Sequence, residues 1–284
     1  MPLEYTIKYK SKNFYENFVQ EALWQFLIIP ENNDTQILNS YNLINNRNFL
    51  VTKSINGYGF ETFRVIAKEE FNEIEFEAIF TLLKREVNPF DFEIKNTPQM
   101  DHESIQNISF KVDFEPFLRI TELTKLPINS LDIYQIDTAK SIFENLQQLN
   151  TWTYKFLNFK AEVTDISTTI NRLLLIREGV CQDFSHLFIA IARKNGIPSR
   201  YVSGYLHQGH GYFGDLQMHA WVECFIPNIG WIGFDPTNNI LSNENHIKVA
   251  HGKDYTDCPP IKGVIFSSGS NETNHTVQVM AQQQ

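Results

Sequence analysis

The chain has 284 residues, 42% of them hydrophobic, so it is long enough to bury a sizeable core in one or two domains. Its formal net charge of −9 and the lack of any basic run argue against binding to a nucleic-acid backbone. No stretch reaches the roughly 20 apolar residues of a membrane span, and the start of the chain lacks the apolar core of a signal peptide. Three cysteines do not make a disulfide framework, so we expect a soluble protein of a reducing compartment, the cytoplasm, with neither nucleic acid nor membrane as partner.

The first hundred residues are predicted to be β-rich. Apolar and polar residues alternate over 3–9 and again over 22–28, which is typical of strands with one buried face. Asn56-Gly57, between two apolar segments, indicates a β-hairpin turn. Residues 73–82 begin with alternating glutamate and apolar side chains, which favours a strand, although extra apolar residues leave a helix as the alternative. We therefore predict that residues 1–100 form an antiparallel β domain.

A second domain is predicted over residues 101–284. Prolines and polar clusters interrupt the pattern between 88 and 135, which indicates the crossing between the two domains. Helical periodicity and then strand-like alternation follow. The predicted helices cover 142–149 and 167–177, and the predicted strands cover 200–206, 217–226, 231–234, 263–267 and 276–280. The expected fold class is therefore α+β.

The strongest helix signal of the chain begins beside a cysteine. Apolar residues recur at helical spacing from Phe184 onward, and Gly196 followed by Pro198 ends the helix. Gly179 loosens the backbone just before it, so Cys181 falls in or beside the first turn. A thiol there lies among unpaired N–H groups at the positive end of the helix dipole, which favours the thiolate form. Cys181 is therefore a candidate nucleophile, although a cysteine on its own is more often a small buried hydrophobe.

A cysteine nucleophile needs a base and a group that orients the base, and His219 and Asp235 supply both near neighbouring strands of one hairpin. If Ile226 paired with Trp231, the imidazole would point to the opposite face from the carboxylate. If Phe225 pairs with Trp231, the two become diagonal neighbours on one face. We therefore predict the second register, with a five-residue loop or a bulge in the hairpin.

These three side chains predict a centre for acyl transfer. Cys181 would attack an acyl carbon, His219 would take up its proton, and Asp235 would fix the imidazole tautomer and stabilise its cationic form. The oxyanion would be bound by the backbone N–H of Cys181 and by one further donor. Trp152 and Tyr154, which lie upstream and carry N–H and O–H groups, are candidates for that donor.

Four blocks of the sequence resemble the transglutaminase-like superfamily and occur in the family's order with similar gaps. The blocks are Gly179–Leu187, Gly196–Tyr205, His219–Glu223 and Gly230–Asn238. A fifth stretch, 246–255, resembles the tail of the bacterial branch, in which arginine is commoner than lysine at the position of Lys248. The resemblance implies a papain-like core, in which the cysteine helix packs on an antiparallel sheet, and a triad of Cys181, His219 and Asp235. The N-terminal third is similar to the β-rich region that precedes this core in bacterial members.

The resemblance also implies a class of reaction. The superfamily includes protein cross-linking enzymes, enzymes that hydrolyse peptides and amides, and inactive members. Cross-linking enzymes of animals carry calcium sites, and this sequence has no EF-hand loop or dense acidic cluster. We therefore expect cysteine-dependent hydrolysis of a peptide or protein amide without a cofactor. Amine transfer to a protein glutamine and a non-catalytic scaffold that retains the fold are the alternatives.

No metal is expected. His207, His210, His219 and Cys224 could be drawn as a zinc site, but no Cys-x-x-Cys accompanies them and Cys224 has the opposite strand parity from His219. The glycine-rich loop over 207–214 is expected to border the substrate cleft instead.

Four further residues near these blocks are not expected to take part in catalysis. Asp183 would oppose thiolate formation if it pointed at Cys181, so we expect it to point away. His186 lies on another part of the helix. Cys224 has the apolar parity of its strand, and Cys258 precedes two prolines.

Overall fold

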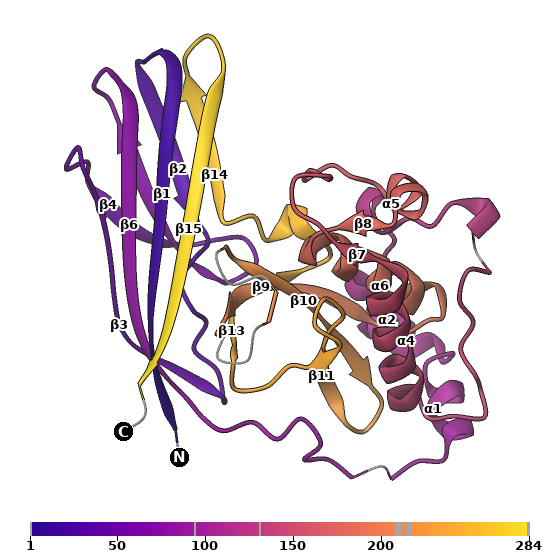
Figure 1. Ribbon diagram of the computed structural model, residues 1–284. Helices are drawn as coiled ribbons and strands as arrows, with labels where there is room; N and C mark the ends of the chain where they lie inside the picture. The colour runs from indigo at the N-terminus through magenta and orange to yellow at the C-terminus, as the bar shows by residue number, and fades with distance from the viewer. Residues whose placement is uncertain (1, 94, 131, 208–211, 214–216, 283–284) are drawn as a thin grey trace.

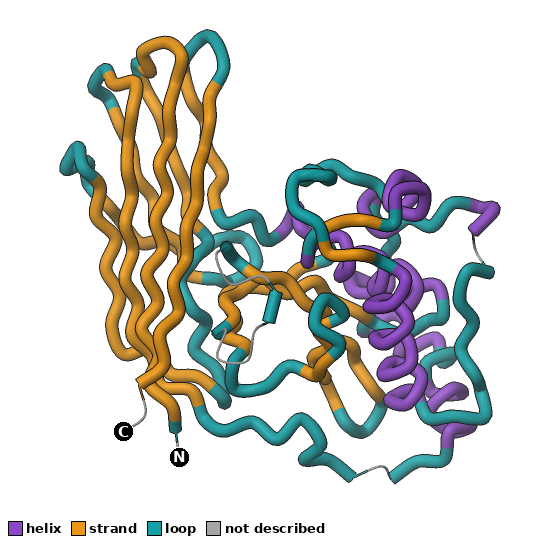
Figure 2. Tube along the Cα trace, in the orientation of Figure 1, coloured by secondary structure: helices purple, strands orange, loops and turns teal. Residues whose placement is uncertain are grey.

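The computed structural model describes residues 2–93, 95–130, 132–207, 212–213 and 217–282. It contains helices and antiparallel sheets in two units that stand side by side, a tall β-rich unit and a mixed unit (Figures 1 and 2). This arrangement confirms the predicted α+β class. No helix in the described part of the chain is both long and apolar enough to cross a membrane.

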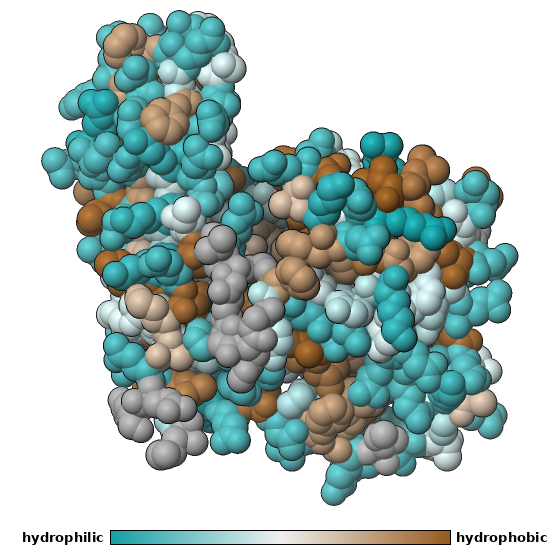
Figure 3. All heavy atoms as spheres, viewed as in Figure 1, coloured by the Kyte–Doolittle hydropathy of each residue, from teal (hydrophilic) through white to brown (hydrophobic). Residues whose placement is uncertain are grey.

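Among the described residues, the β-rich unit consists of two four-stranded sheets with the orders β15-β1-β6-β3 and β14-β2-β5-β4. The strands from the first part of the chain are β1 (Leu3–Val19), β2 (Glu21–Phe26), β3 (Gln36–Asn45), β4 (Val51–Ile55), β5 (Glu61–Ala67) and β6 (Phe71–Lys84). Their alternating apolar side chains form the buried core, which confirms the period-2 pattern. Segment 73–82 is a strand, and its outward glutamates pair with Lys10 and Lys12 of β1. Figure 3 shows a mostly hydrophilic outer face on the upper part of this unit.

The last two strands, β14 (Ile261–Phe266) and β15 (Asn271–Gln282), return to the β-rich unit (Figure 1). β14 pairs with β2 and β15 pairs with β1, both antiparallel. The sequence prediction had placed them with residues 101–284. Pairing satisfies backbone N–H and C=O groups that an edge strand would otherwise expose, and the partners lie more than 230 residues apart in the chain. Local patterns predict the strands but carry no information about such distant partners.

Among the described residues, the mixed unit is built on a five-stranded antiparallel sheet with the order β12-β11-β10-β9-β13. Helix α6 (Cys181–Lys194) packs against β10 and β9, and α4 (Ile142–Phe156) packs against α6. The sheet strands are β9 (Ser199–Leu206), β10 (His219–Ile226), β11 (Gly230–Asp235), β12 (Ile240–Leu241) and β13 (His246–Gly252). The remaining elements are α1 (Pro98–Ser104), α2 (Ile108–Asp113), α3 (Glu115–Leu118), α5 (Ile170–Ile176), the parallel pair β7 (Asn158–Phe159) and β8 (Glu178–Gly179), and short 3-10 turns at Glu122–Thr124, Ile128–Ser130 and Tyr255–Asp257. The predicted crossing between the units thus contains three short helices.

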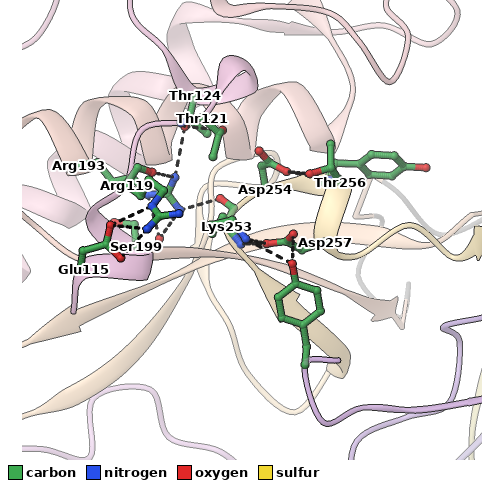
Figure 4. Close-up of polar contacts among 12 residues, drawn as sticks. Glu115, Arg119, Thr121, Thr124, Arg193, Ser199, Lys253, Asp254, Thr256 and Asp257 are labelled. Atoms are coloured by element: carbon green, nitrogen blue, oxygen red, sulfur yellow. Dashed lines mark hydrogen bonds and ion pairs between the residues drawn. The ribbon is translucent and has the colours of Figure 1, made fainter. Parts of the chain in front are cut away.

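Arg193, near the end of α6, links several segments of the mixed unit through hydrogen bonds (Figure 4). Its side chain is 4% exposed and donates hydrogen bonds to four backbone carbonyls and one hydroxyl. The acceptors are the carbonyl oxygens of Phe117, Arg119, Ser199 and Lys253 and Oγ1 of Thr124. One guanidinium therefore joins the cysteine helix to the segment after α3, to β9 and to the turn that follows β13.

Hydrogen bonds join the two units directly. The hydroxyl of Tyr205 in β9 donates to the carbonyl of Ile28 at 2.6 Å. The amide of Gln36 donates to the carbonyl of Lys248 at 2.7 Å and accepts from its N–H at 3.0 Å. These buried contacts fix the orientation of the core sheet relative to the β-rich unit.

Gly204, in the middle of β9, provides a stability prediction. A Cβ at this position would lie 2.3 Å from the carbonyl oxygen of Ile247 and 2.5 Å from the Trp221 ring. The carbonyl oxygen of Ile247 belongs to the backbone of β13, which pairs with β9. Gly204→Ala is therefore expected to lower the free energy of unfolding by about 1–3 kcal/mol. Urea unfolding measures this. Gly57→Ala, whose Cβ would meet no atom within 4 Å, is the matched control. Equal stability of the two variants would contradict the prediction.

Candidate active site

Cys181 is the first residue of α6 and is partly exposed. The helix start is held by Asp183, whose Oδ2 accepts hydrogen bonds from the N–H of Val180 at 2.8 Å and from the hydroxyl of Thr164 at 2.7 Å. This carboxylate is thus occupied at the helix cap, as expected if it points away from the thiol. The N–H of Cys181 is one of the first four of the helix, which have no acceptor within the helix itself.

The hairpin of β10 and β11 has the register that the acyl-transfer hypothesis requires. Phe225 pairs with Trp231 and Val222 with Phe234, so the predicted alignment is confirmed. The turn uses positive φ at Asn228 (63°) and Gly230 (105°), a backbone region that asparagine and glycine adopt most readily. This register puts His219 and Asp235 on one face of the sheet.

The structure brings the three predicted side chains together. His219 and Asp235 are fully buried, with 2.8 Å between His219 Nε2 and Asp235 Oδ2. Cys181 is near enough to the ring to contribute to the rise in its pKa, and the two residues line the same cavity. Nε2 is committed to the carboxylate, whereas Nδ1 has no hydrogen-bond partner among the described residues. The imidazole is therefore held by the carboxylate and lies near the thiol.

The surroundings of His219 favour its charged form. Burial by itself would lower the pKa of this imidazole, but the carboxylate of Asp235 and the nearby Cys181 outweigh it and raise the pKa to about 10. Burial would likewise raise the pKa of Asp235, but the two histidines beside it hold that pKa well below its usual range. An imidazolium next to a thiol stabilises the thiolate.

Asp235 has more partners than the sequence predicted. Its Oδ1 accepts the N–H groups of Thr237 and Asn238, and its Oδ2 accepts the side-chain amide of Asn238 at 2.8 Å. His246 Nε2 lies 3.2 Å from the same Oδ2. The Asp-Pro-Thr-Asn stretch is a signal for the local bonds, since aspartate side chains commonly bind the N–H two residues ahead. The contact with His246 depends on β13 and has no such signal.

Several other sequence predictions concern residues outside this centre. Trp152 and Tyr154 lie on α4 and do not line the cavity beside Cys181, so the geometry does not support them as oxyanion donors. His186 is buried and accepts the N–H of Tyr255, which is a structural contact. Two residues of the zinc pattern that the sequence analysis rejected have other partners, since His207 contacts Asn245 and Cys224 contacts Ser199. His210 and most of the loop over 207–214 lie outside the described residues.

One group of side chains in the described part of the chain has the geometry to ligate a metal. His219, Asp235 and His246 each offer one ligand atom, and these atoms lie within 4.8 Å of one another. All three are buried, and the two Nε2 atoms already share hydrogen bonds with Oδ2 of Asp235. The arrangement is that of a carboxylate orienting two imidazoles.

A cavity of about 280 Å³ opens beside the centre and is lined by both Cys181 and His219. Gln182 and Gln217 line it as well and offer neutral hydrogen-bonding groups. A substrate carbonyl bound there would have the thiol, the imidazole and the N-terminal end of α6 within reach. This set of groups can perform nucleophilic attack on an acyl carbon.

Comparison with known proteins identifies the family that this part of the chain resembles. Residues 130–236 match the sequence model of the Transglutaminase-like superfamily, and this segment includes all three side chains of the centre. The chain carries a transglutaminase-like domain. The recognition made from the sequence blocks is thereby confirmed.

Curated relatives share parts of this domain. An uncharacterized protein of Mycobacterium tuberculosis is 38% identical over 141 residues, which cover 46% of this chain and 45% of that protein. A protein-glutamine gamma-glutamyltransferase of Pseudomonas aeruginosa is 30% identical over 101 residues, or 34% of this chain and 15% of that protein. The chain therefore spans less than half the length of these relatives.

A solved structure shares the whole architecture. A Cytophaga hutchinsonii protein proposed to be a cysteine protease superposes with a TM-score of 0.80 at 18% sequence identity, covering 100% of this chain and 92% of that one. At this identity the likeness establishes the fold. Both units, including the returning strands β14 and β15, are thus part of a fold that the transglutaminase-like domain shares with a known structure.

Proposed function

We propose that the protein is a cysteine-dependent acyl-transfer enzyme that hydrolyses peptide or amide bonds. The observation that carries the proposal is the buried imidazole of His219, bonded to Asp235 and close to Cys181 in the wall of one cavity. The structural likeness to a protein proposed to be a cysteine protease supports it.

The proposed reaction has two steps. The Cys181 thiolate attacks the carbonyl carbon, a C–S bond forms, and the C–N bond breaks as His219 protonates the leaving amine. Water then attacks the thioester with His219 as base, and releases a carboxylic acid and the free thiol. Asp235 keeps the imidazole in one orientation throughout. The reaction needs no cofactor.

Amine transfer is the second candidate, because the Pseudomonas aeruginosa relative is a protein-glutamine gamma-glutamyltransferase. It differs only in the second step, where a primary amine replaces water. Incubation of a glutamine peptide with a primary amine, followed by mass spectrometry, separates the two. Cleavage or deamidation supports hydrolysis, and an amine adduct supports transfer. Equal product from wild type and Cys181→Ala would contradict both, and would favour a non-catalytic scaffold.

Thiol labelling tests the activated cysteine without a known substrate. Iodoacetamide at pH 7 is expected to label Cys181 at least about 10-fold faster in the wild type than in His219→Ala, because the imidazolium that stabilises the thiolate is lost. Peptide mapping by mass spectrometry measures the rate. His207→Ala, which removes a histidine outside the cavity, is the matched control. Equal rates in wild type and His219→Ala would argue against an activated thiol.

A further inference from the structure

The cavity beside Cys181 has walls from both units. The mixed unit supplies the thiol and His219, and the β-rich unit supplies Tyr9 from β1 and His275 from β15. β1 and β15 are neighbouring strands formed by the two ends of the chain, and Tyr9 is paired with Val277. The returning C-terminal strands lie on the side of the β-rich unit nearest the mixed unit in Figure 1. The β-rich unit therefore contributes directly to the space that a substrate would occupy.

Tyr9 determines which nitrogen of His275 carries the proton. Its hydroxyl lies 2.9 Å from His275 Nδ1. Burial raises the pKa of Tyr9 and lowers the pKa of His275, so both side chains are neutral near pH 7. Tyr9 is 1% exposed, so its hydroxyl proton has little access to water and Nδ1 is the acceptor beside it. Once Nδ1 accepts, the ring proton sits on Nε2.

The result is a neutral hydrogen-bond donor in the cavity wall. His275 is half-buried and lines the cavity, and its Nε2–H is not used by the bond to Tyr9. A neutral N–H of this kind pairs with a carbonyl oxygen, the acceptor that every peptide unit carries.

The remaining wall disfavours acidic substrates. No lysine or arginine is among the described residues that line the cavity. The one carboxylate among the described residues of the lining, Asp165, accepts hydrogen bonds from the side chains of Ser167 and Thr168. Much of the other lining is apolar or aromatic: Ile166, Val180, Tyr201, Met218, Tyr255 and Ile261. Apart from the imidazole of His219, which is already paired with Asp235, an acidic side chain would find no cation among the described lining residues to replace its lost hydration, so an uncharged chain fits better.

We propose that Tyr9 and His275 form a substrate-binding pair, in which His275 Nε2–H binds a backbone carbonyl of an uncharged peptide acyl donor and Tyr9 holds the imidazole in place. His275 is the residue that touches substrate, and Tyr9 is a positioning residue. The inference rests on the proposed function, since it concerns the acyl donor of Cys181. It gives the β-rich unit a role in substrate selection.

The test uses two alkylating probes on the full chain. A blocked phenylalanyl-glycyl chloromethyl ketone fills the cavity and forms a C–S bond at Cys181 with loss of chloride, whereas iodoacetamide is too small to depend on the wall. His275→Ala and Tyr9→Phe are expected to slow the peptide probe about 5- to 10-fold, the value of one hydrogen bond, and to leave the iodoacetamide rate unchanged. Gln278→Ala, on the exposed face of β15, is the matched control and should change neither rate.

The outcomes distinguish a failure of the proposed substrate-binding pair from a failure of the proposed acyl-transfer function. An unchanged iodoacetamide rate shows that each variant retains its fold at Cys181, so an unchanged peptide rate in both variants would overturn the substrate-binding pair. A probe with glutamate in place of phenylalanine is expected to react at least about 10-fold more slowly with the wild type, and an equal or faster reaction would also overturn the inference. If iodoacetamide labels Cys181 no faster in the wild type than in His219→Ala, the proposed function itself fails.

Discussion

An Asp235→Asn variant is expected to lose acyl-transfer activity by about 10⁴-fold while keeping its shape. Asparagine has the size of aspartate, and its carbonyl can still accept the N–H groups of Thr237 and Asn238. It has no charge, however, and its amide group would face the Nε2–H of His219. The imidazole would then lose both its orientation and the anion that stabilises its protonated form.

The same variant is expected to lose a characteristic dependence of stability on pH. The pKa of His219 is raised from 6.5 to about 10 in the folded protein, so its contribution to stability is fully present below pH 6.5 and is lost as pH rises through about 10. The wild type should therefore lose a few kcal/mol relative to Asp235→Asn over this window. Urea unfolding of both proteins at pH 6.5 and pH 9.5 measures the difference.

The comparison between the two proteins isolates this effect. Lys84, whose pKa burial lowers to about 8, also titrates in this window, but it does so in both proteins. Parallel pH profiles for wild type and Asp235→Asn would show that the carboxylate does not hold the proton on His219. An intact activity in the variant would remove Asp235 from the proposed mechanism.

Much of this centre follows from local sequence. Helical spacing puts Cys181 at the start of its helix, and strand parity leaves two hairpin registers, of which one lets His219 meet Asp235. Both inferences use only neighbouring residues, for which periodicity is informative. His246 was missed because its contact with Asp235 requires β13 to lie beside β9, with a register shift between Lys248 and Ala250.

In the β-rich unit, too, local sequence predicts the individual strands but not the contacts between distant ones. Alternation predicts its strands, including the segment 73–82, because one face of each strand is buried. The pairing of β15 with β1, and with it the contact between Tyr9 and His275, joins residues 266 positions apart. No local pattern predicts this long-range pairing. The sequence prediction therefore placed β14 and β15 in the second domain, whereas they pair with β2 and β1 of the β-rich unit. The cavity wall could be found only from the structure.

The largest loss of stability is expected at Arg193. Its guanidinium satisfies the carbonyls of Ser199 and Lys253 as well as the segment after α3, all in a buried site. Arg193→Ala leaves these acceptors without a donor and opens a cavity at the end of α6. We expect the free energy of unfolding to fall by about 3–5 kcal/mol, since several buried polar groups lose their partner at once. Arg193→Lys should recover only part, because an ammonium cannot reproduce the planar fork of donors.

Urea unfolding measures the effect, and Arg172→Ala, an exposed arginine on α5, is the matched control. Amide exchange adds a local readout. The carbonyl of Lys253 lies just before the turn Tyr255–Asp257, where Tyr255 binds His186 and lines the cavity. If Arg193 fastens this turn to the helix, exchange at Tyr255 should accelerate in Arg193→Ala even at temperatures where the protein stays folded. A stability loss below about 1 kcal/mol, the range of ordinary surface changes, would mean that the turn is held by its other contacts.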